Sequence, residues 1–305
     1  MISFRYHLVS LVAVFLALAL GIVVGTTALN GPITTDLRNQ VNTLKSDRGA
    51  LAQQVKTLQG QVSDAGQFAT SFGAQIVNGS LAKQNVLMIG LPGAIGSVQD
   101  GIAKEIAAAG GKVSGQVQLT AAYVDQRRGS DIIALATGAV HPPGLTLPQG
   151  TADPGQIGGA LLAYVLLGQG LPTDLTQVIG GFSELHMVSA SASLVASTTI
   201  VVVGTGAMRV GDYAARSELA FVTALQQRGG HVVVAGDPSS ATLAGIVAGV
   251  RGAAGDKTTI STIDNADGAI GQISTVLALA DITNSSVGHY GTGKGADSLF
   301  PTPTK

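Results

Sequence analysis

The sequence predicts an α/β protein that is held to a membrane by one N-terminal helix. Three features support this: an uncharged run from Leu8 to Leu29, a seven-residue apolar repeat behind it, and alternating strand-like and helix-like segments from Val86 onward. Such alternation is typical of a parallel sheet covered by helices on both faces. The predicted order is a single transmembrane helix, a long coiled-coil helix and a parallel-sheet α/β domain.

The composition excludes several classes of function. The chain has 305 residues and a net charge of −1, which gives no support for nucleic acid as a partner. Only 11% of its residues are charged, against roughly 25% in typical soluble domains. It has no Cys, so disulfides, Cys-ligated zinc, thiol catalysis and a lipid-modified N-terminal Cys are all excluded.

The apolar run at residues 8–29 predicts a retained transmembrane anchor. As a helix it would span roughly 33 Å, enough for a hydrocarbon core of about 30 Å. The apolar part of a cleaved signal peptide is usually about 7–15 residues long and ends at a small-x-small site. Here Ala17-Leu18-Ala19 lies in the middle of the run. Cleavage after Ala28 remains the alternative, although Thr26 fits that site poorly.

The flanking charges predict the orientation of the anchor. Arg5, His7 and the free amine precede the run, and the first charge after it is Asp36. The positive-inside tendency therefore places residues 1–7 in the cytoplasm and the C-terminal domain outside it. Gly21 and Gly25 form a G-x-x-x-G pattern that can let two transmembrane helices approach closely.

Behind a linker predicted at residues 30–35, around Gly31-Pro32, a heptad repeat predicts a coiled coil over residues 36–78. It would be about 60 Å long. The predicted dimer seam consists of Leu37, Val41, Leu44, Arg48, Leu51, Val55, Leu58 and Val62. The same spacing continues through Ala65, Ala69, Phe72 and Ile76.

Val at the a positions with Leu at the d positions favours two parallel strands, and Arg48 at an a position would trade stability for register. We therefore expect a parallel homodimer. The alternative is that the apolar stripe packs on the chain's own α/β domain as a long hairpin.

The α/β domain is predicted over residues 84–283. Strands are expected at 86–90, 112–119, 199–203, 231–235 and 258–263, and helices at 97–109, 156–167, 213–228, 239–250 and 266–282. Ile132–Ala136 fits either a strand end or a buried helix. Residues 284–305, rich in Gly, Ser, Thr and Pro, are predicted to be a flexible tail.

The glycine-rich motifs do not match known phosphate-binding patterns. Gly90-x-x-Gly93-x-x-Gly96 has the wrong spacing for a dinucleotide fingerprint, and Gly204-Thr205-Gly206 lacks the third glycine. Gly293-Lys294 follows a helix rather than a strand, and Gly181-Phe182-Ser183 is only half of a nucleophile elbow. A helix beginning after Asp237 could hold an anion at its N-terminus. We expect a protein that is not an enzyme.

Metal ligands are equally sparse. The weak candidates are His186, Met187 and His289, because His186-Met187 is the one adjacent pair of soft ligands. Copper(I) prefers thiolate and thioether ligands, but the chain has no Cys and only four Met. We expect no bound cofactor.

The string "ISFRYHLVSLVAVFLALALGIVVG", the heptads behind it and the closing "GHYGTGKGA" resemble the MctB family of actinobacteria. This family is named for mycobacterial copper transport protein B and includes the corynebacterial cell-separation protein SteB. The resemblance implies an envelope protein in copper homeostasis or efflux, described in the family as an outer-membrane transport protein. Copper enters as a cofactor through this resemblance only, and the family offers no ligand motif to map onto this chain.

Two functions follow. The first is a membrane-anchored envelope protein of copper homeostasis that is not itself a pore, because repeated ten-residue alternating segments typical of membrane-spanning strands are missing. The alternative is a non-catalytic, dimeric coiled-coil scaffold in cell separation or envelope assembly, with an envelope or cell-division protein as its partner. An α/β enzyme or small-ligand binder has only the fold class in its favour.

Overall fold

The structure is a computed structural model that describes residues 4–253 and 259–302. Within the first helix, the side chains of residues 27–34 lie outside the described part. The chain divides into two compact units, Met1–Asp64 and Ala65–Lys305. The first is a single helical segment, and the second holds the sheet and all the other helices.

Helix α1 is continuous from Phe4 to Val77. Residues 30–35, predicted as a linker, belong to this same helix, so the predicted break is wrong. A helix is costly to start but gains one hydrogen bond for each residue it adds, which favours continuation between two strongly helical segments. The long helix is confirmed, whereas its pairing as a coiled coil stays a prediction.

The second unit contains a seven-stranded sheet with the strand order β3-β2-β1-β4-β5-β6-β7. The strands are β1 (Asn85–Gly90), β2 (Lys112–Leu119), β3 (Val188–Ala190), β4 (Thr199–Gly204), β5 (His231–Gly236), β6 (Ile260–Ile263) and β7 (His289–Tyr290). Every neighbouring pair is parallel except β2 and β3. The predicted parallel-sheet α/β class is confirmed.

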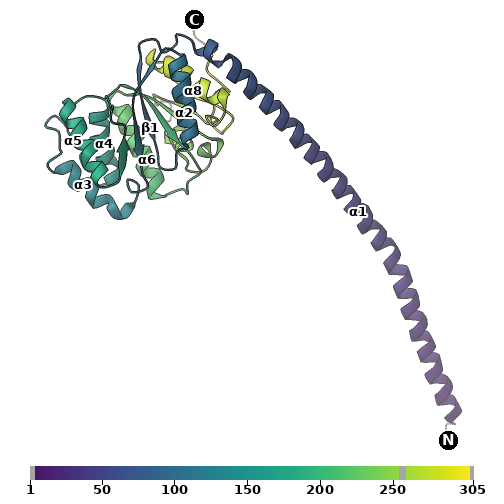
Figure 1. Cartoon of the computed structure of the whole chain (residues 1–305). Coiled ribbons are helices and arrows are strands. Elements are labelled where there is room, and N and C mark those ends of the chain that lie inside the picture. The colour runs from purple at the N-terminus through teal and green to yellow at the C-terminus, as the bar shows by residue number, and fades with distance from the viewer. Residues whose placement is uncertain (1–3, 254–258, 303–305) are drawn as a thin grey trace. The chain divides into compact units, whose positions relative to one another are not determined.

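Helices cover both faces of this sheet (Figure 1). One face carries α2 (Gly96–Ala108), α8 (Ala269–Thr283) and the last turns of α1. The other carries α3 (Gly129–Thr137), α4 (Pro154–Leu166), α5 (Pro172–Glu184), α6 (Tyr213–Gln227) and α7 (Ile246–Ala253). Short 3₁₀ helices lie at Gln126–Arg128 and Pro238–Ala241.

The Val-rich strand β4 shows why this sheet needs two helical layers. Ile200 and Val202 belong to the core beneath α4 and α6, while Val201 and Val203 belong to the core beneath α2 and α8. Successive side chains of a strand point to opposite faces, so a continuous apolar run requires burial on both sides. All six residues of β4 are buried.

Two local predictions differ from the structure. Ile132–Ala136 lies in helix α3, which settles the ambiguity left by its periodicity. The single helix predicted at 239–250 is instead the 3₁₀ turn Pro238–Ala241 followed by α7. The two are separated where Leu243 adopts a positive φ of 48°, a conformation that a continuous right-handed helix excludes.

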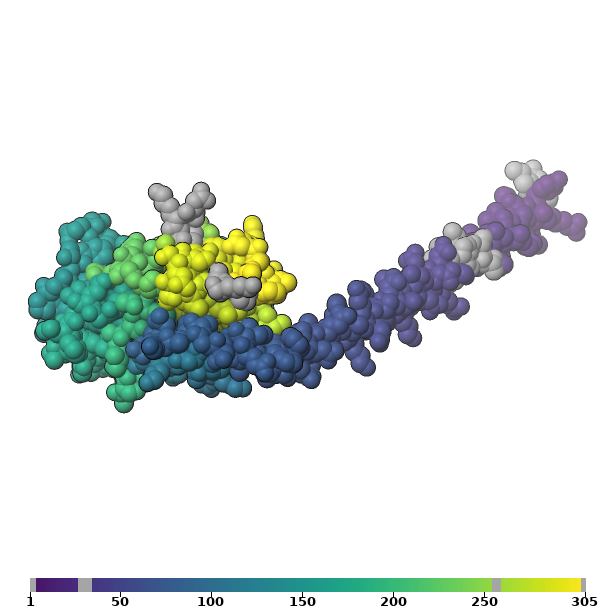
Figure 2. All heavy atoms as spheres, turned by 90° about the horizontal axis from the view of Figure 1, so that it is seen from above, coloured from purple at the N-terminus to yellow at the C-terminus, as the bar shows by residue number. Residues whose placement is uncertain are grey.

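The predicted flexible tail is also wrong for its described part. Residues 289–290 form β7 beside β6, and residues 291–302 continue over the domain, seen in yellow in Figure 2. The glycines of this segment let the backbone pass close to the buried Asp264, and they do not indicate a flexible tail. Residues 303–305 lie outside the described part.

Candidate functional site

The predicted seam on α1 is an exposed apolar face. The exposed fractions of its seven apolar side chains run from 51% at Val55 and Leu58 to 72% at Val62, and Arg48 is also exposed. Burying a Leu or Val side chain contributes about 1.5–3 kcal/mol. A helix face that leaves this much apolar surface in water has a strong physical reason to pair.

After Asp64, some apolar residues of α1 are buried in the α/β domain and others are exposed. Ala69 is only 5% exposed and Val77 fully buried in the core beneath α2 and α8. Its heptad position predicted that Ala69 would continue the seam. The structure instead places it in the core of the α/β domain. Gly73 lies between them, and a Cβ added there would meet the side chain of Ile273 at 2.8 Å. The last turns of α1 thus pack on the α/β domain within the second unit.

Three large apolar residues near the end of α1 stay outside that contact. Phe68 is 63% exposed, Phe72 43% and Ile76 45%. The rings of Phe68 and Phe72 lie 4.7 Å apart, centre to centre. Within the second unit, the last turns of α1 thus carry an exposed apolar strip of Phe68, Phe72 and Ile76.

The first part of α1 is long and apolar enough to cross a membrane. Phe4–Thr26 forms a 23-residue segment with a mean hydropathy of 2.8. A Cβ added to Gly21 or Gly25 would meet no atom within 4 Å. Both glycines thus leave a flat, open strip on the helix surface, which is the surface that close helix contacts in membranes use.

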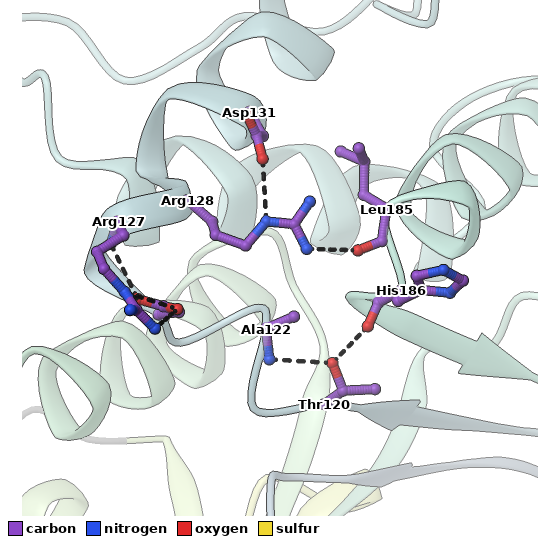
Figure 3. Close-up of polar contacts among 8 residues, drawn as sticks. Thr120, Ala122, Arg127, Arg128, Asp131, Leu185 and His186 are labelled. Atoms are coloured by element: carbon purple, nitrogen blue, oxygen red, sulfur yellow. Dashed lines mark hydrogen bonds and ion pairs between the residues drawn. The ribbon is translucent and has the colours of Figure 1, made fainter.

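The structure does not bring His186 and Met187 together as ligands. Met187 is fully buried in the core beneath α4, whereas His186 is exposed at a turn with a positive φ of 55°. Figure 3 shows the imidazole directed away from the contacts made by its backbone. The His186 carbonyl accepts a hydrogen bond from Thr120 Oγ1 at 2.6 Å. This residue closes a turn beside β2.

His289, the third weak candidate, lies on β7, far along the chain from the other two. Its Nδ1 is 3.0 Å from Thr262 Oγ1, and its backbone N–H donates to Asp297 Oδ2 at 2.8 Å. Burial lowers the pKa of His289 and the charge of Arg251 adds to this, while Asp297 opposes it. Within residues 4–253 and 259–302 no cluster of three or more His, Asp or Glu side chains is placed to share a metal ion.

The most completely bonded polar group that sequence reasoning missed is a buried ion pair beneath the tail. Arg251 Nη1 lies 2.8 Å from Asp264 Oδ2, and their side chains are 5% and 0% exposed. The Asp264 carboxylate also accepts hydrogen bonds from the backbone N–H groups of Thr292 and Gly293 at 2.8 and 2.9 Å. We call Arg251, Asp264 and residues 289–297 the C-terminal clamp.

The clamp explains the glycines of "GHYGTGKGA". Arg251 also donates to the carbonyls of Tyr290 and Lys294, at 3.0 and 3.1 Å. A Cβ added to Gly293 would lie 2.6 Å from the Ala241 Cβ. Since the backbone N–H groups of this loop face a carboxylate of the chain itself, Gly293-Lys294 serves as part of the fold.

Gly204 ends β4 at the carboxyl edge of the sheet, beside β1. This is where the strand order reverses, the usual ligand crevice of such sheets. A Cβ added to Gly204 would lie 2.6 Å from Ile246 and 3.2 Å from Leu91, two buried side chains. Apolar side chains therefore occupy the space near β4 that a phosphate group would need.

The predicted anion position after Asp237 is occupied by that residue's own carboxylate. Asp237 accepts hydrogen bonds from the Ser239 hydroxyl at 2.7 Å and from the backbone N–H groups of Gly206 and Ser240, at 3.2 and 3.3 Å. Burial acts to raise the pKa of Asp237, but these hydrogen bonds lower it overall. An external anion would have to displace this carboxylate.

A cavity of about 750 Å³ lies between the loop that contains Thr146, Leu147 and Pro148 and helices α4 and α6. Arg228, on its wall, is held by the Thr146 carbonyl at 3.0 Å and by Gln169 Oε1 at 3.2 Å. It also lies over the ring of Tyr164. The guanidinium of Arg228 thus links this loop to the neighbouring helices through its hydrogen bonds and its contact with Tyr164.

The comparisons with known proteins cover nearly the whole chain. The family described as "Copper transport outer membrane protein, MctB" matches residues 1–301. "Copper transporter MctB" of Mycobacterium tuberculosis H37Rv is 32% identical over 310 residues, 98% of this chain and 99% of that protein. "Copper transporter MctB" of Mycobacterium leprae is 32% identical over 314 residues, with the same coverage. With anchor, long helix, α/β domain and C-terminal clamp all inside the match, this chain belongs to the MctB family of membrane proteins.

Proposed function

We propose that the protein is a membrane-anchored cell-envelope protein that supports copper homeostasis or efflux without forming the pore itself. The observation that carries this is the full-length relationship to proteins named as copper transporters, with 98% of the chain aligned. The proposed arrangement places residues 1–7 in the cytoplasm and the α/β domain outside it, following the positive charge before the anchor. Association of the mature protein with the outer membrane rests on the family description alone.

The architecture supports an accessory role rather than a conducting one. Among the described residues one helix segment, Phe4–Thr26, is long and apolar enough to cross a membrane, and one such helix offers no lumen of its own. The strands of the α/β domain are covered by helices on both faces and have no face to turn toward lipid. The weak copper candidates His186 and Met187 point to solvent and to the core respectively. We therefore place the copper-conducting step in a partner protein.

Deletion of the gene in its native host tests this proposal. We expect the deletion strain to be several-fold more sensitive to copper and to accumulate more of it, and the full chain to restore both. H186A should restore them equally well, because within the described residues His186 belongs to no cluster of side chains that could hold a metal ion. Purified protein in vesicles with an entrapped copper indicator should show no flux. Normal tolerance and normal copper content in the deletion strain would contradict the copper role.

A second function is favoured by the exposed seam on α1: a non-catalytic, dimeric scaffold in cell separation or envelope assembly. Apolar a and d positions with 51–72% of their side-chain surface exposed favour a two-stranded parallel coiled coil. Such a rod would hold two α/β domains at a fixed distance from the membrane, available to an envelope or cell-division protein.

Because the chain has no Cys, this scaffold can be tested by introducing single cysteines. L44C or L51C should form a disulfide-linked dimer in membranes. Lys56→Cys, off the seam by heptad position, is the matched control and should crosslink far less. A deletion strain with defective cell separation and normal copper tolerance would favour the scaffold over the copper role, and equal crosslinking at all three sites would argue against the seam.

A further inference from the structure

Arg48 is the one charged residue among the predicted seam positions of α1. Its neighbour Asp47 occupies the adjoining g position of the heptad. Both side chains are exposed, and neither is in a salt bridge within the described residues. An Arg in an otherwise apolar seam costs dimer stability unless its charge is compensated across the interface.

Knobs-into-holes packing defines what Arg48 would meet on a second copy. In a parallel, in-register pair, a residue at an a position inserts between the a′ residue, the two flanking d′ residues and the preceding g′ residue of the partner helix. For Arg48 these are Arg48, Leu44, Leu51 and Asp47 of the second copy. The carboxylate of Asp47 is therefore the acidic group within reach of each guanidinium.

We propose that Arg48 of each copy pairs with Asp47 of the other, and that this reciprocal ion pair selects a second copy of this chain as the partner of the seam. The proposal deepens the scaffold function and rests on its coiled coil. Two Arg48 and two Asp47 side chains form one electrically neutral layer, which relieves the repulsion that Arg48 would meet from its own counterpart.

The charge pattern along the helix makes this layer specific. The e and g positions from residue 38 to residue 66 are Arg38, Gln40, Lys45, Asp47, Ala52, Gln54, Gln59, Gln61 and Gly66. Asp47 is the single acid among them. A shift by one heptad would place Arg48 against Val41 or Val55, with Gln40 or Gln54 in place of the acid. Only the in-register pair compensates the charge.

The anchor supports the same geometry. Two copies inserted in one membrane with the same orientation carry their α1 helices in parallel and start them at the same depth. Antiparallel pairing is thereby excluded for the anchored chain. The anchor and the Arg48–Asp47 layer thus favour the same alignment from two points along the helix.

Charge reversal in the full-length, membrane-inserted protein tests the proposal, with L44C as the crosslinking reporter. D47R leaves only basic charge in the layer, and R48D leaves only acidic charge. We expect each variant alone to raise the dimer dissociation constant by about tenfold. Differently tagged D47R and R48D chains expressed together should form a heterodimer as readily as the unaltered chain forms a homodimer, because each restores the charge that the other lacks.

Matched reversals at outward heptad positions, D64R and K56D, control for net charge and should leave crosslinking unchanged. If D47R and R48D crosslink like the unaltered chain, or fail to recover when mixed, the ion pair is overturned while the coiled coil stands. If L44C does not crosslink in the unaltered background, the coiled coil itself is overturned. Since Asp47 and Arg48 lie outside the α/β domain, all variants should show the same thermal unfolding of that domain.

Discussion

At the scale of single residues, Glu218 has a carboxyl group with a strongly raised pKa. It lies on α6 with 1% of its surface exposed. Burial, reinforced by the negative charge of Asp212, raises its pKa from 4.5 to about 8. The folded domain therefore keeps this carboxyl protonated at a pH where the unfolded chain has released the proton.

This raised pKa makes the free energy of unfolding depend on pH. Between about pH 4.5 and pH 8 the folded state binds more protons than the unfolded state, so the free energy of unfolding falls as the pH rises. A shift of this size corresponds to on the order of 5 kcal/mol. E218Q should remove this loss, and the variant should exceed the unaltered protein in stability at pH 8.5 but not at pH 4.5.

Urea unfolding of the detergent-solubilised full chain, followed by circular dichroism at both pH values, measures this. The exposed Glu184, at the end of α5, supplies the control E184Q, which should keep the pH dependence of the unaltered protein. A parallel loss of stability with pH in E218Q would show that other groups cause it.

Arg251 is the residue on which the C-terminal clamp depends. Removing one member of a buried ion pair costs about 3–5 kcal/mol, because the other charge is left uncompensated. We expect R251M to lower the free energy of unfolding by that amount and to speed native-state cleavage by trypsin after the exposed Lys294, because Arg251 no longer holds the Lys294 carbonyl. R127M is the control, since Arg127 pairs with Asp125 while 90% of its side chain is exposed, and such pairs contribute less than about 1 kcal/mol. Equal destabilisation by both variants would contradict the role of the clamp.

At the scale of elements, the end of α1 has one face for its own domain and another that remains open. Val77 is fully buried and Ile76 is 45% exposed, although they are adjacent. V77A should lower the stability of the α/β domain by about 2 kcal/mol through the cavity it leaves. I76A should change it by less than about 0.5 kcal/mol but weaken crosslinking through L44C, if the exposed face continues the seam. Thermal unfolding and crosslinking of the same two variants separate these effects.

The elements that local pattern determines were predictable from sequence. β2 has the predicted bounds, Lys112–Leu119, although a register shift after Val113 puts this side chain on the opposite face of the sheet from Val117 and Leu119. The Val-rich runs of β4 and β5 indicated burial on both faces, and both are central strands. The long helix behind the anchor followed from its heptads, although its continuity through residues 30–35 did not.

The elements that depend on distant contacts were not predictable. β7 is only His289–Tyr290, and what holds the tail around it is an ion pair between Arg251 and Asp264, which come from two other elements. Likewise, adjacency of His186 and Met187 suggested a ligand pair, but the chain turns at His186 with a positive φ, which leaves this residue exposed and Met187 buried. Sequence spacing alone does not carry this information.

At the scale of the whole molecule, three parts that lie far apart in the sequence matter for function: the apolar N-terminal helix segment, the predicted seam and the C-terminal clamp. Phe4–Thr26 is long and apolar enough to cross a membrane, the predicted seam is an exposed apolar face, and the clamp holds the last described strand on the α/β domain. Each of these parts lies within the family match at residues 1–301. We therefore expect the protein to function only while its α/β domain stays attached to the membrane.

Replacement of the anchor tests this requirement. If residues 4–26 are exchanged for a cleavable signal peptide, the α/β domain should fold and be found in the soluble envelope fraction, but the copper tolerance of a deletion strain should not be restored. An unrelated uncleaved transmembrane helix of the same length is the control and should restore it, apart from any contribution of Gly21 and Gly25 to pairing. N-terminal sequencing of the unaltered protein from membranes should begin at or next to Met1, because a retained anchor keeps Arg5 and His7 attached. A mature N-terminus after Ala28, together with full complementation by the released domain, would show that the helix only directs export.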